Sequence, residues 1–177
     1  MNDISLLISP ALRPWLLAVF IVLFLVVGKA MQSITASVKP KPIWLEFPWT
    51  KKGADEILDE WKKDATAAGK VRKSLALDFL FIVAYVGVII IIGAMASGAH
   101  WIAHWVGAAI TWAAITAGVL DVIENFGQFV MLAGQRGLWP LFTSVCASVK
   151  FLLVFIAAPY ALLFLVPAVI RHFRHQP

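Results

Sequence analysis

Four long apolar stretches constrain the fold of this chain more than any other feature of its sequence. They cover approximately residues 14–38, 75–96, 101–133 and 138–170. Each is long enough to cross the hydrocarbon core of a bilayer, which takes about 20 helical residues. Only 14% of the 177 residues are charged, against about 25% in soluble domains. The sequence therefore predicts an all-α integral membrane protein, a single membrane domain built as a four-transmembrane-helix bundle.

The first apolar stretch has two interpretations. Its core from Trp15 to Val27 is short for a span, but a helix could continue to about Val38 with Lys29 reaching the membrane surface. The alternative is a secretory signal peptide with Ala30 as the cleavage position, against which no good small-x-small site follows a basic N-terminal region. We therefore expect a transmembrane helix here and keep a cleaved signal peptide as the alternative.

Basic residues concentrate in one connector of the chain. Ten of the fifteen Lys and Arg residues lie between Lys29 and Lys73, and Arg136 falls between the last two stretches. Cytoplasmic loops carry this kind of positive excess. We therefore expect a protein of the bacterial cytoplasmic (inner) membrane, with segment 39–73 in the cytoplasm and both termini outside it. The same rule explains the net charge of +5 without a nucleic-acid partner.

Segment 39–73 is expected to carry an amphipathic helix on the cytoplasmic membrane surface, after a proline-rich extended connector. From about 54 to 70, acidic residues precede basic ones, which suits the helix dipole. The apolar stripe of this helix includes Ile57, Leu58 and Trp61. We expect Trp61 to lie at headgroup depth with Trp44 and Trp49. Alternatively, the stripe is an interface that docks a partner protein.

Polar residues inside the third apolar stretch form the most informative group in the chain. They are Asp121, Glu124, Asn125 and Gln128. Their spacing of i, i+3, i+4 and i+7 places them on one face of a helix. An ionised side chain at this depth costs about 3 kcal/mol or more unless it is paired. Small residues continue the same face toward the helix start, so we expect it to pack against protein rather than lipid.

A lysine in the fourth stretch is the expected partner of these acids. The short turn between the third and fourth stretches makes them antiparallel neighbours, so Lys150 lies at the depth of Asp121 and Glu124. Asp78 enters from the second stretch, on the same helix face as Tyr85. Three acids against one base leave at least one carboxyl group to be protonated, hydrogen-bonded or bound to a cation. The network either fixes the helix packing or serves transport or binding.

Two histidine pairs offer a weak metal site at the outer end of the bundle. They are His100 with His104 and His172 with His175. The two pairs together could hold a transition metal, or one residue from each pair could bind haem. Histidine beside tryptophan is, however, ordinary at a membrane interface. We therefore predict no cofactor and keep haem or a transition metal as the alternative.

The sequence contains none of the common enzyme motifs. It lacks a phosphate-binding loop, a Gly-x-Ser-x-Gly elbow and a His-Glu-x-x-His helix. We expect a non-enzymatic accessory or scaffold subunit, or a lipid-binding protein, whose partners are membrane lipid and a larger membrane complex or a second copy of the chain. A small transporter or proton- or cation-conducting protein using Asp121, Glu124 and Lys150 is the first alternative. A haem or metal redox subunit is the second.

Three segments resemble a loose group of uncharacterised bacterial multi-pass membrane proteins. They are Trp61 and Gly69 before Val71-Arg-Lys-Ser, then Leu77-Asp78-Phe79-Leu-Phe-Ile-Val-Ala-Tyr85, and Leu120-Asp121-x-x-Glu124-Asn125. The resemblance covers most of residues 47–135. It implies the same membrane architecture and includes the same polar residues, but it implies no activity.

Overall fold

The computed structural model describes residues 8–96 and 104–174, and within them it is helical with short connections. Its elements are α1 (Arg13–Ile34), the 3-10 helix η2 (Pro42–Glu46), α2 (Lys51–Lys62), α3 (Ala67–Ala96), α4 (His104–Leu132) and α5 (Trp139–Arg174). Helices α1, α3, α4 and the Trp139–Pro159 part of α5 are long and apolar enough to cross a membrane. The predicted all-α membrane bundle with four spans is confirmed.

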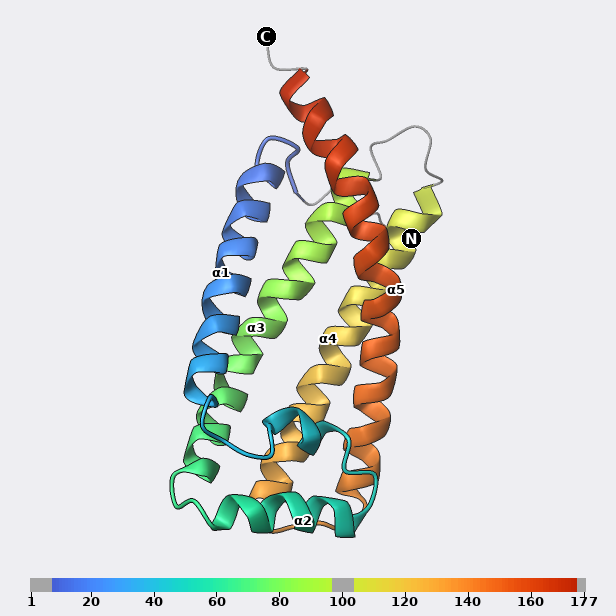
Figure 1. Cartoon of the computed structure of the whole chain (residues 1–177). Coiled ribbons are helices and arrows are strands. Elements are labelled where there is room, and N and C mark those ends of the chain that lie inside the picture. The colour runs from blue at the N-terminus through green and yellow to red at the C-terminus, as the bar shows by residue number, and fades with distance from the viewer. Residues whose placement is uncertain (1–7, 97–103, 175–177) are drawn as a thin grey trace.

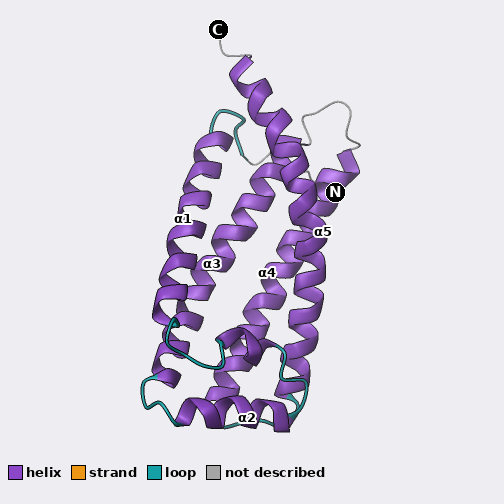
Figure 2. Cartoon of the chain, in the orientation of Figure 1, coloured by secondary structure: helices purple, strands orange, loops and turns teal. Residues whose placement is uncertain are grey.

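The four long helices run alternately up and down along the bundle (Figure 1). Helix α2 lies across the end where α1 finishes and α3 begins, and η2 lies just inside it (Figures 1 and 2). Helices α4 and α5 pack most extensively, and α3 packs on both α1 and α4. Helix α1 is therefore attached to the bundle chiefly through α3.

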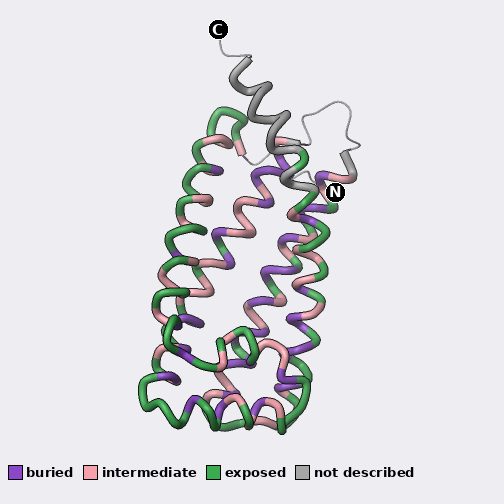
Figure 3. The backbone as a smooth tube through the Cα atoms, viewed as in Figure 1, coloured by how far each residue is buried: buried purple, intermediate pink, exposed green. Residues whose placement is uncertain are grey.

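Burial divides α4 into the two faces that the sequence predicts. Asp121, Glu124, Asn125 and Gln128 are all buried. On the opposite face, Val119 is 54% exposed and Phe126 is 57% exposed. Exposed positions likewise follow the outside of α1, α3 and α5 (Figure 3). The bundle thus buries polar side chains and presents large apolar ones outward, as expected for a protein surrounded by lipid.

Several helices begin or end at residues other than the approximate bounds of the predicted spans. Helix α1 ends at Ile34 rather than near residue 38. At this end, the Thr35 hydroxyl donates a hydrogen bond to the Met31 carbonyl at 2.8 Å. Such a bond within the last turn competes with continued helix. Helix α3 begins at Ala67, eight residues before the predicted span. The remaining bounds are closer, since α4 ends at Leu132 and α5 starts at Trp139.

The amphipathic helix is shorter than predicted. Thr50 caps α2, because its side chain accepts a hydrogen bond from the Gly53 N–H at 3.0 Å. The helix ends at Lys62, and the Asp64 carboxylate then accepts the Thr66 backbone N–H at 2.8 Å. That local bond stabilises a turn in place of further helix. The basic residues Lys70, Arg72 and Lys73 consequently belong to α3.

The apolar stripe of α2 faces the bundle rather than headgroups or a partner, which corrects the prediction. Trp61 is only 1% exposed, and its indole N–H donates to the Pro40 carbonyl at 2.9 Å. Leu58 is buried beside it, and Ile57 is partly buried against the same cluster. The cluster also contains Val38, Leu45, Ala54, Ala67, Val71, Leu75 and Met131. The stripe therefore fastens α2 across the end of the bundle.

The proline-rich connector is extended only up to η2, which folds into the bundle. Leu45 is fully buried, whereas Trp44 is 60% exposed. The Trp49 backbone N–H donates to Ser144 Oγ on α5 at 2.9 Å, which ties the end of the connector to that helix. Non-helical backbone can lie inside a membrane protein only where protein covers it in this way. The connector thereby brings the residue after Leu45, Glu46, close to α5.

Candidate functional site

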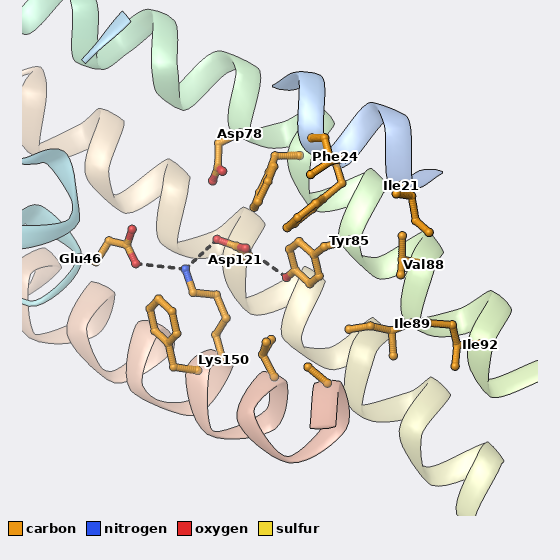
Figure 4. A pocket seen from close by; sticks show the side chains of 15 residues that line it. Ile21, Phe24, Glu46, Asp78, Tyr85, Val88, Ile89, Ile92, Asp121 and Lys150 are labelled. Carbon is orange, nitrogen blue, oxygen red and sulfur yellow. Dashed lines mark hydrogen bonds and ion pairs between the residues drawn. The ribbon is translucent and has the colours of Figure 1, made fainter. Parts of the chain in front are cut away.

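Lys150 on α5 is the centre of a buried polar site (Figure 4). Its Nζ lies 2.9 Å from Asp121 Oδ1, 2.7 Å from Glu124 Oε2 and 3.3 Å from Glu46 Oε2. Only 7% of Lys150 is exposed. The expected pairing of Lys150 with Asp121 or Glu124 is present, and the lysine contacts both acids at once.

The depth of this contact follows from the antiparallel packing of α4 and α5. Asp121 precedes the end of α4 at Leu132 by eleven residues, and Lys150 follows the start of α5 at Trp139 by eleven. At 1.5 Å per residue, both lie about 16 Å along their helices from the shared turn. Small residues allow the two helices to approach, and a Cβ on Gly127 would collide with the Thr143 side chain. The positions of Asp121 and Lys150 relative to the shared turn are thus sufficient to predict that they pair.

Uncharged donors orient the carboxylates. Asn125 Nδ2 donates to Asp78 Oδ2 at 2.6 Å, Gln128 Nε2 to Glu124 Oε1 at 2.9 Å, and the Tyr85 hydroxyl to Asp121 Oδ2 at 3.1 Å. All seven residues of the predicted network therefore meet in one place. Because these three donors are neutral, they hold the acids in position without balancing their charge.

Glu46 is the member of the network that sequence reasoning missed. It belongs to a segment expected to be a surface connector, yet η2 inserts its carboxylate beside Lys150. Burial raises the pKa of Glu46 above its ordinary value of 4.5, and the Lys150 ammonium opposes part of that rise. The available signal was the sequence Leu45-Glu46-Phe47, which places an acid between large apolar residues in a lysine-rich connector.

Acids outnumber bases in the site by four to one. Glu46, Asp121 and Glu124 surround Lys150, whereas Asp78 has no Lys or Arg nitrogen within 4.0 Å among the described residues. If every group were ionised, the site would hold a large negative charge away from water. Such a site is stable only if carboxyl groups take up protons or a cation enters.

A cavity of about 640 Å³ opens beside the network. Its apolar walls consist of Ile21, Phe24 and Leu25 from α1, Phe81, Val88, Ile89 and Ile92 from α3, and Phe151, Val154 and Ala158 from α5. Glu46, Asp78, Tyr85, Asp121 and Lys150 line its polar end (Figure 4). Asp78 and Ile92, fourteen residues apart on α3, are separated by about 21 Å along the helix. The cavity is therefore elongated, with one charged end.

Glu124 does not line the cavity. It is fully buried, and its two oxygens contact Gln128 Nε2 and Lys150 Nζ. The contact from Lys150 to Oε2 is an ion pair without the alignment of a hydrogen bond. Asp78 and Tyr85, in contrast, are only partly buried and face the cavity. The network thus has an enclosed side and an open side.

The predicted histidine site cannot be placed on the described part of the chain. His100 and His175 lie outside the described residues, and His104 and His172 belong to α4 and α5 with side chains that are not described. Among the side chains that are described, no group of three or more His, Cys, Asp or Glu could hold a metal ion. The metal and haem alternative therefore stays a prediction.

Comparison with known proteins adds no relative. The chain matches no protein-family model, no curated protein and no solved structure. The resemblance to a group of bacterial membrane proteins stays a prediction. The geometry of the cavity and its polar end is accordingly the basis for inferring a function.

Proposed function

We propose that this chain is a membrane protein that binds a lipid or lipid-like molecule in the cavity between α1, α3 and α5. The observation that carries the proposal is the combination of long apolar walls with a single polar end. In a molecule with a hydrocarbon body and a polar head, the body matches the apolar walls and the head matches the polar end of the cavity. The predicted role as a lipid-binding protein is the one that this geometry favours.

The size of the cavity supports this proposal. Ligand sites typically occupy about 300 to 1,000 Å³, and a volume of about 640 Å³ lies well within that range. Apolar side chains around an empty volume lack contacts that hydrocarbon would supply. Filling the cavity with an acyl or alkyl chain therefore stabilises both the ligand and the walls.

The attachment of α1 supports entry of the ligand from the bilayer. Helix α1 packs chiefly on α3, while its Ile21, Phe24 and Leu25 form one wall of the cavity. A small displacement of α1 relative to α5 would widen the opening without disturbing the α4–α5 pair. The ligand would then pass sideways from the surrounding lipid instead of crossing water.

The orientation in the membrane is part of the proposal. The end that carries α2 contains most of the lysine and arginine, and it faces the cytoplasm by the positive-inside rule. We propose a bacterial inner-membrane location with both termini outside the cytoplasm. Protease that cleaves residues 39–73 from the outside of oriented vesicles would contradict this orientation. The accessory-subunit, transporter and redox roles stay predictions.

A photoreactive dodecanol tests lipid binding directly. The probe carries a diazirine at its tail and is irradiated with the protein in phosphatidylcholine nanodiscs. We expect saturable labelling of cavity residues such as Val88 and Val154, because a specific site fills at a lower probe concentration than the annular lipid layer. Mass spectrometry of the peptides measures the labelled fraction at each residue.

A matched pair of variants on α3 provides the control. Val88→Trp places a large ring in the cavity, whereas Val83→Trp places the same ring on an outward face, where Val83 is 55% exposed. Val88→Trp should abolish saturable labelling and Val83→Trp should preserve it. Labelling that never saturates, or that survives Val88→Trp unchanged, would overturn the proposal.

A further inference from the structure

We infer that the molecule bound in the cavity is a cationic amphiphile, with a single ammonium group at the Asp78 end and an apolar body along α1, α3 and α5. This inference depends on the proposed binding of a lipid-like molecule and specifies its head. It combines two independent observations, the elongated apolar cavity and the unbalanced charge at its polar end.

The position of Asp78 favours an ammonium head. Its Oδ2 accepts one hydrogen bond from Asn125, but no Lys or Arg within 4.0 Å balances its charge among the described residues. It lines the cavity together with Asp121 and Glu46. Figure 4 shows the Asp78 carboxylate facing the space above Asp121. An ammonium group placed there gains charge-assisted hydrogen bonds that a neutral head cannot make.

Lys150 is already paired with acids of the protein and is not available to an anionic head. Its Nζ contacts three carboxylates within 3.3 Å and lies 4.9 Å from the Phe151 ring centre. A carboxylate or phosphate head would have to displace one of these acids and would meet the others at short range. Like charges at such distances disfavour an anionic ligand. The site therefore disfavours fatty acids and anionic phospholipids.

Aromatic rings line the cavity near its polar end and also favour a cation. Phe24 and Phe81 stack with ring centres 4.7 Å apart, and Phe81 lies 6.0 Å from the Tyr85 ring. All three rings line the cavity. The faces of aromatic rings attract cations in sites with little water. The rings thus favour the same charge as the carboxylates and remain compatible with an alkyl chain.

Competition against the photoreactive dodecanol tests the inference. Dodecylamine, dodecanol and dodecanoate have the same chain and differ in the charge of the head at neutral pH. We expect dodecylamine to displace the probe at a concentration about tenfold or more below that of dodecanol, the effect of one charge-assisted contact. Dodecanoate should compete more weakly than dodecanol. Equal competition by amine and alcohol, or strongest competition by dodecanoate, would overturn the inference.

The variant Asp78→Asn tests whether the preference for dodecylamine over dodecanol depends on the Asp78 side chain. Asparagine keeps an oxygen to accept the Asn125 hydrogen bond and removes the charge, so the bundle should fold. We expect it to weaken dodecylamine competition about tenfold and leave dodecanol unchanged. Glu56→Gln on the outer face of α2, where the Glu56 side chain is 68% exposed, is the matched control. Undiminished dodecylamine competition in Asp78→Asn would contradict the role of Asp78.

The two proposals fail in different ways. If saturable labelling is absent, the cavity binds no amphiphile and the proposed function is wrong. If labelling is saturable but the amine shows no advantage over the alcohol, lipid binding stands and only the ammonium head is wrong.

Discussion

The enclosed and open sides of the polar network each contain a carboxylate held by a carboxamide, but the surroundings of the two carboxylates differ. On the enclosed side, Glu124 is fully buried between Gln128 and Lys150. On the open side, Asp78 is likewise held by a carboxamide, that of Asn125, but it faces a cavity and has no basic partner within 4.0 Å among the described residues. A carboxylate that is held by a carboxamide on a helix can therefore stabilise helix packing when it is enclosed, or remain accessible to a ligand when it faces a cavity.

The difference shows how a small membrane protein can combine a stable frame with a binding site. Helices α4 and α5 pack closely around Lys150 and form the most extensive helix pair of the bundle. Helix α1 closes the cavity from one side and depends on α3 for its attachment. Substitutions on the enclosed side should change stability, whereas those on the open side should change ligand binding.

Lys150→Met should have the largest effect, because it leaves the surrounding acids without their cation. Breaking a buried ion pair by removing one partner typically costs about 3 to 5 kcal/mol. Thermal or denaturant unfolding in mild detergent measures the loss. Lys29→Met is the matched control, since Lys29 is exposed on α1 and should change stability by no more than about 0.5 kcal/mol. A Lys150→Met protein as stable as the parent would show that Lys150 faces water or headgroups.

Gly127→Ala should have the next largest effect, because it tests the close packing on the enclosed side. A Cβ at this position would collide with the Thr143 side chain and lie 3.4 Å from the Trp139 ring. Overpacking of this kind costs about 1 to 3 kcal/mol. Gly69→Ala on α3 is the control, because nothing lies within 4 Å of its added Cβ. It should be neutral or stabilise the helix by up to about 1 kcal/mol.

Tyr85→Phe should have a smaller effect, because it removes one hydrogen bond at the boundary between the two sides. The Tyr85 hydroxyl donates to Asp121 Oδ2 at 3.1 Å. Polar contacts between membrane helices are worth about 0.6 kcal/mol on average. We expect a loss of this order in unfolding experiments. A loss as large as that of Lys150→Met would mean that Tyr85 belongs to the enclosed side.

Glu46→Gln should change the free energy of unfolding least at low pH. Its effect should appear in the pH dependence of stability. Burial raises the pKa of Glu46 above its ordinary value of 4.5, so the folded protein binds this proton more tightly than the unfolded chain. Its contribution to stability is lost as the pH rises from about 4.5 through the raised pKa. Glu46→Gln should flatten that fall, and Glu56→Gln should not. An unchanged slope would contradict insertion of Glu46 beside Lys150.

The fold and the centre of the site could be predicted from the sequence because both depend on regular helix geometry. The 3.6-residue period groups Asp121, Glu124, Asn125 and Gln128 on one face, and the short turn between the last two spans sets the depth of Lys150. These predictions need no knowledge of loops. They describe the enclosed side of the network almost completely.

The parts that sequence reasoning missed depend on tertiary contacts of the connector. Glu46 reaches Lys150 only because η2 folds inward, and Trp61 is buried because α2 packs across the bundle end. An amphipathic stripe has the same pattern whether it lies on lipid or on protein, so periodicity could not place Trp61. The cavity lies between α1, α3 and α5, and α1 packs chiefly on α3; no local sequence pattern encodes this arrangement.

An experimental structure in lipidic mesophase with dodecylamine tests whether the cavity holds an ammonium group against Asp78. It should show elongated density beside Val88 and Val154 that ends within hydrogen-bond distance of Asp78, while Lys150 still contacts Asp121, Glu124 and Glu46. Helix α1 packed against α5 with the cavity closed, or Lys150 turned away from the three acids, would contradict the proposed site.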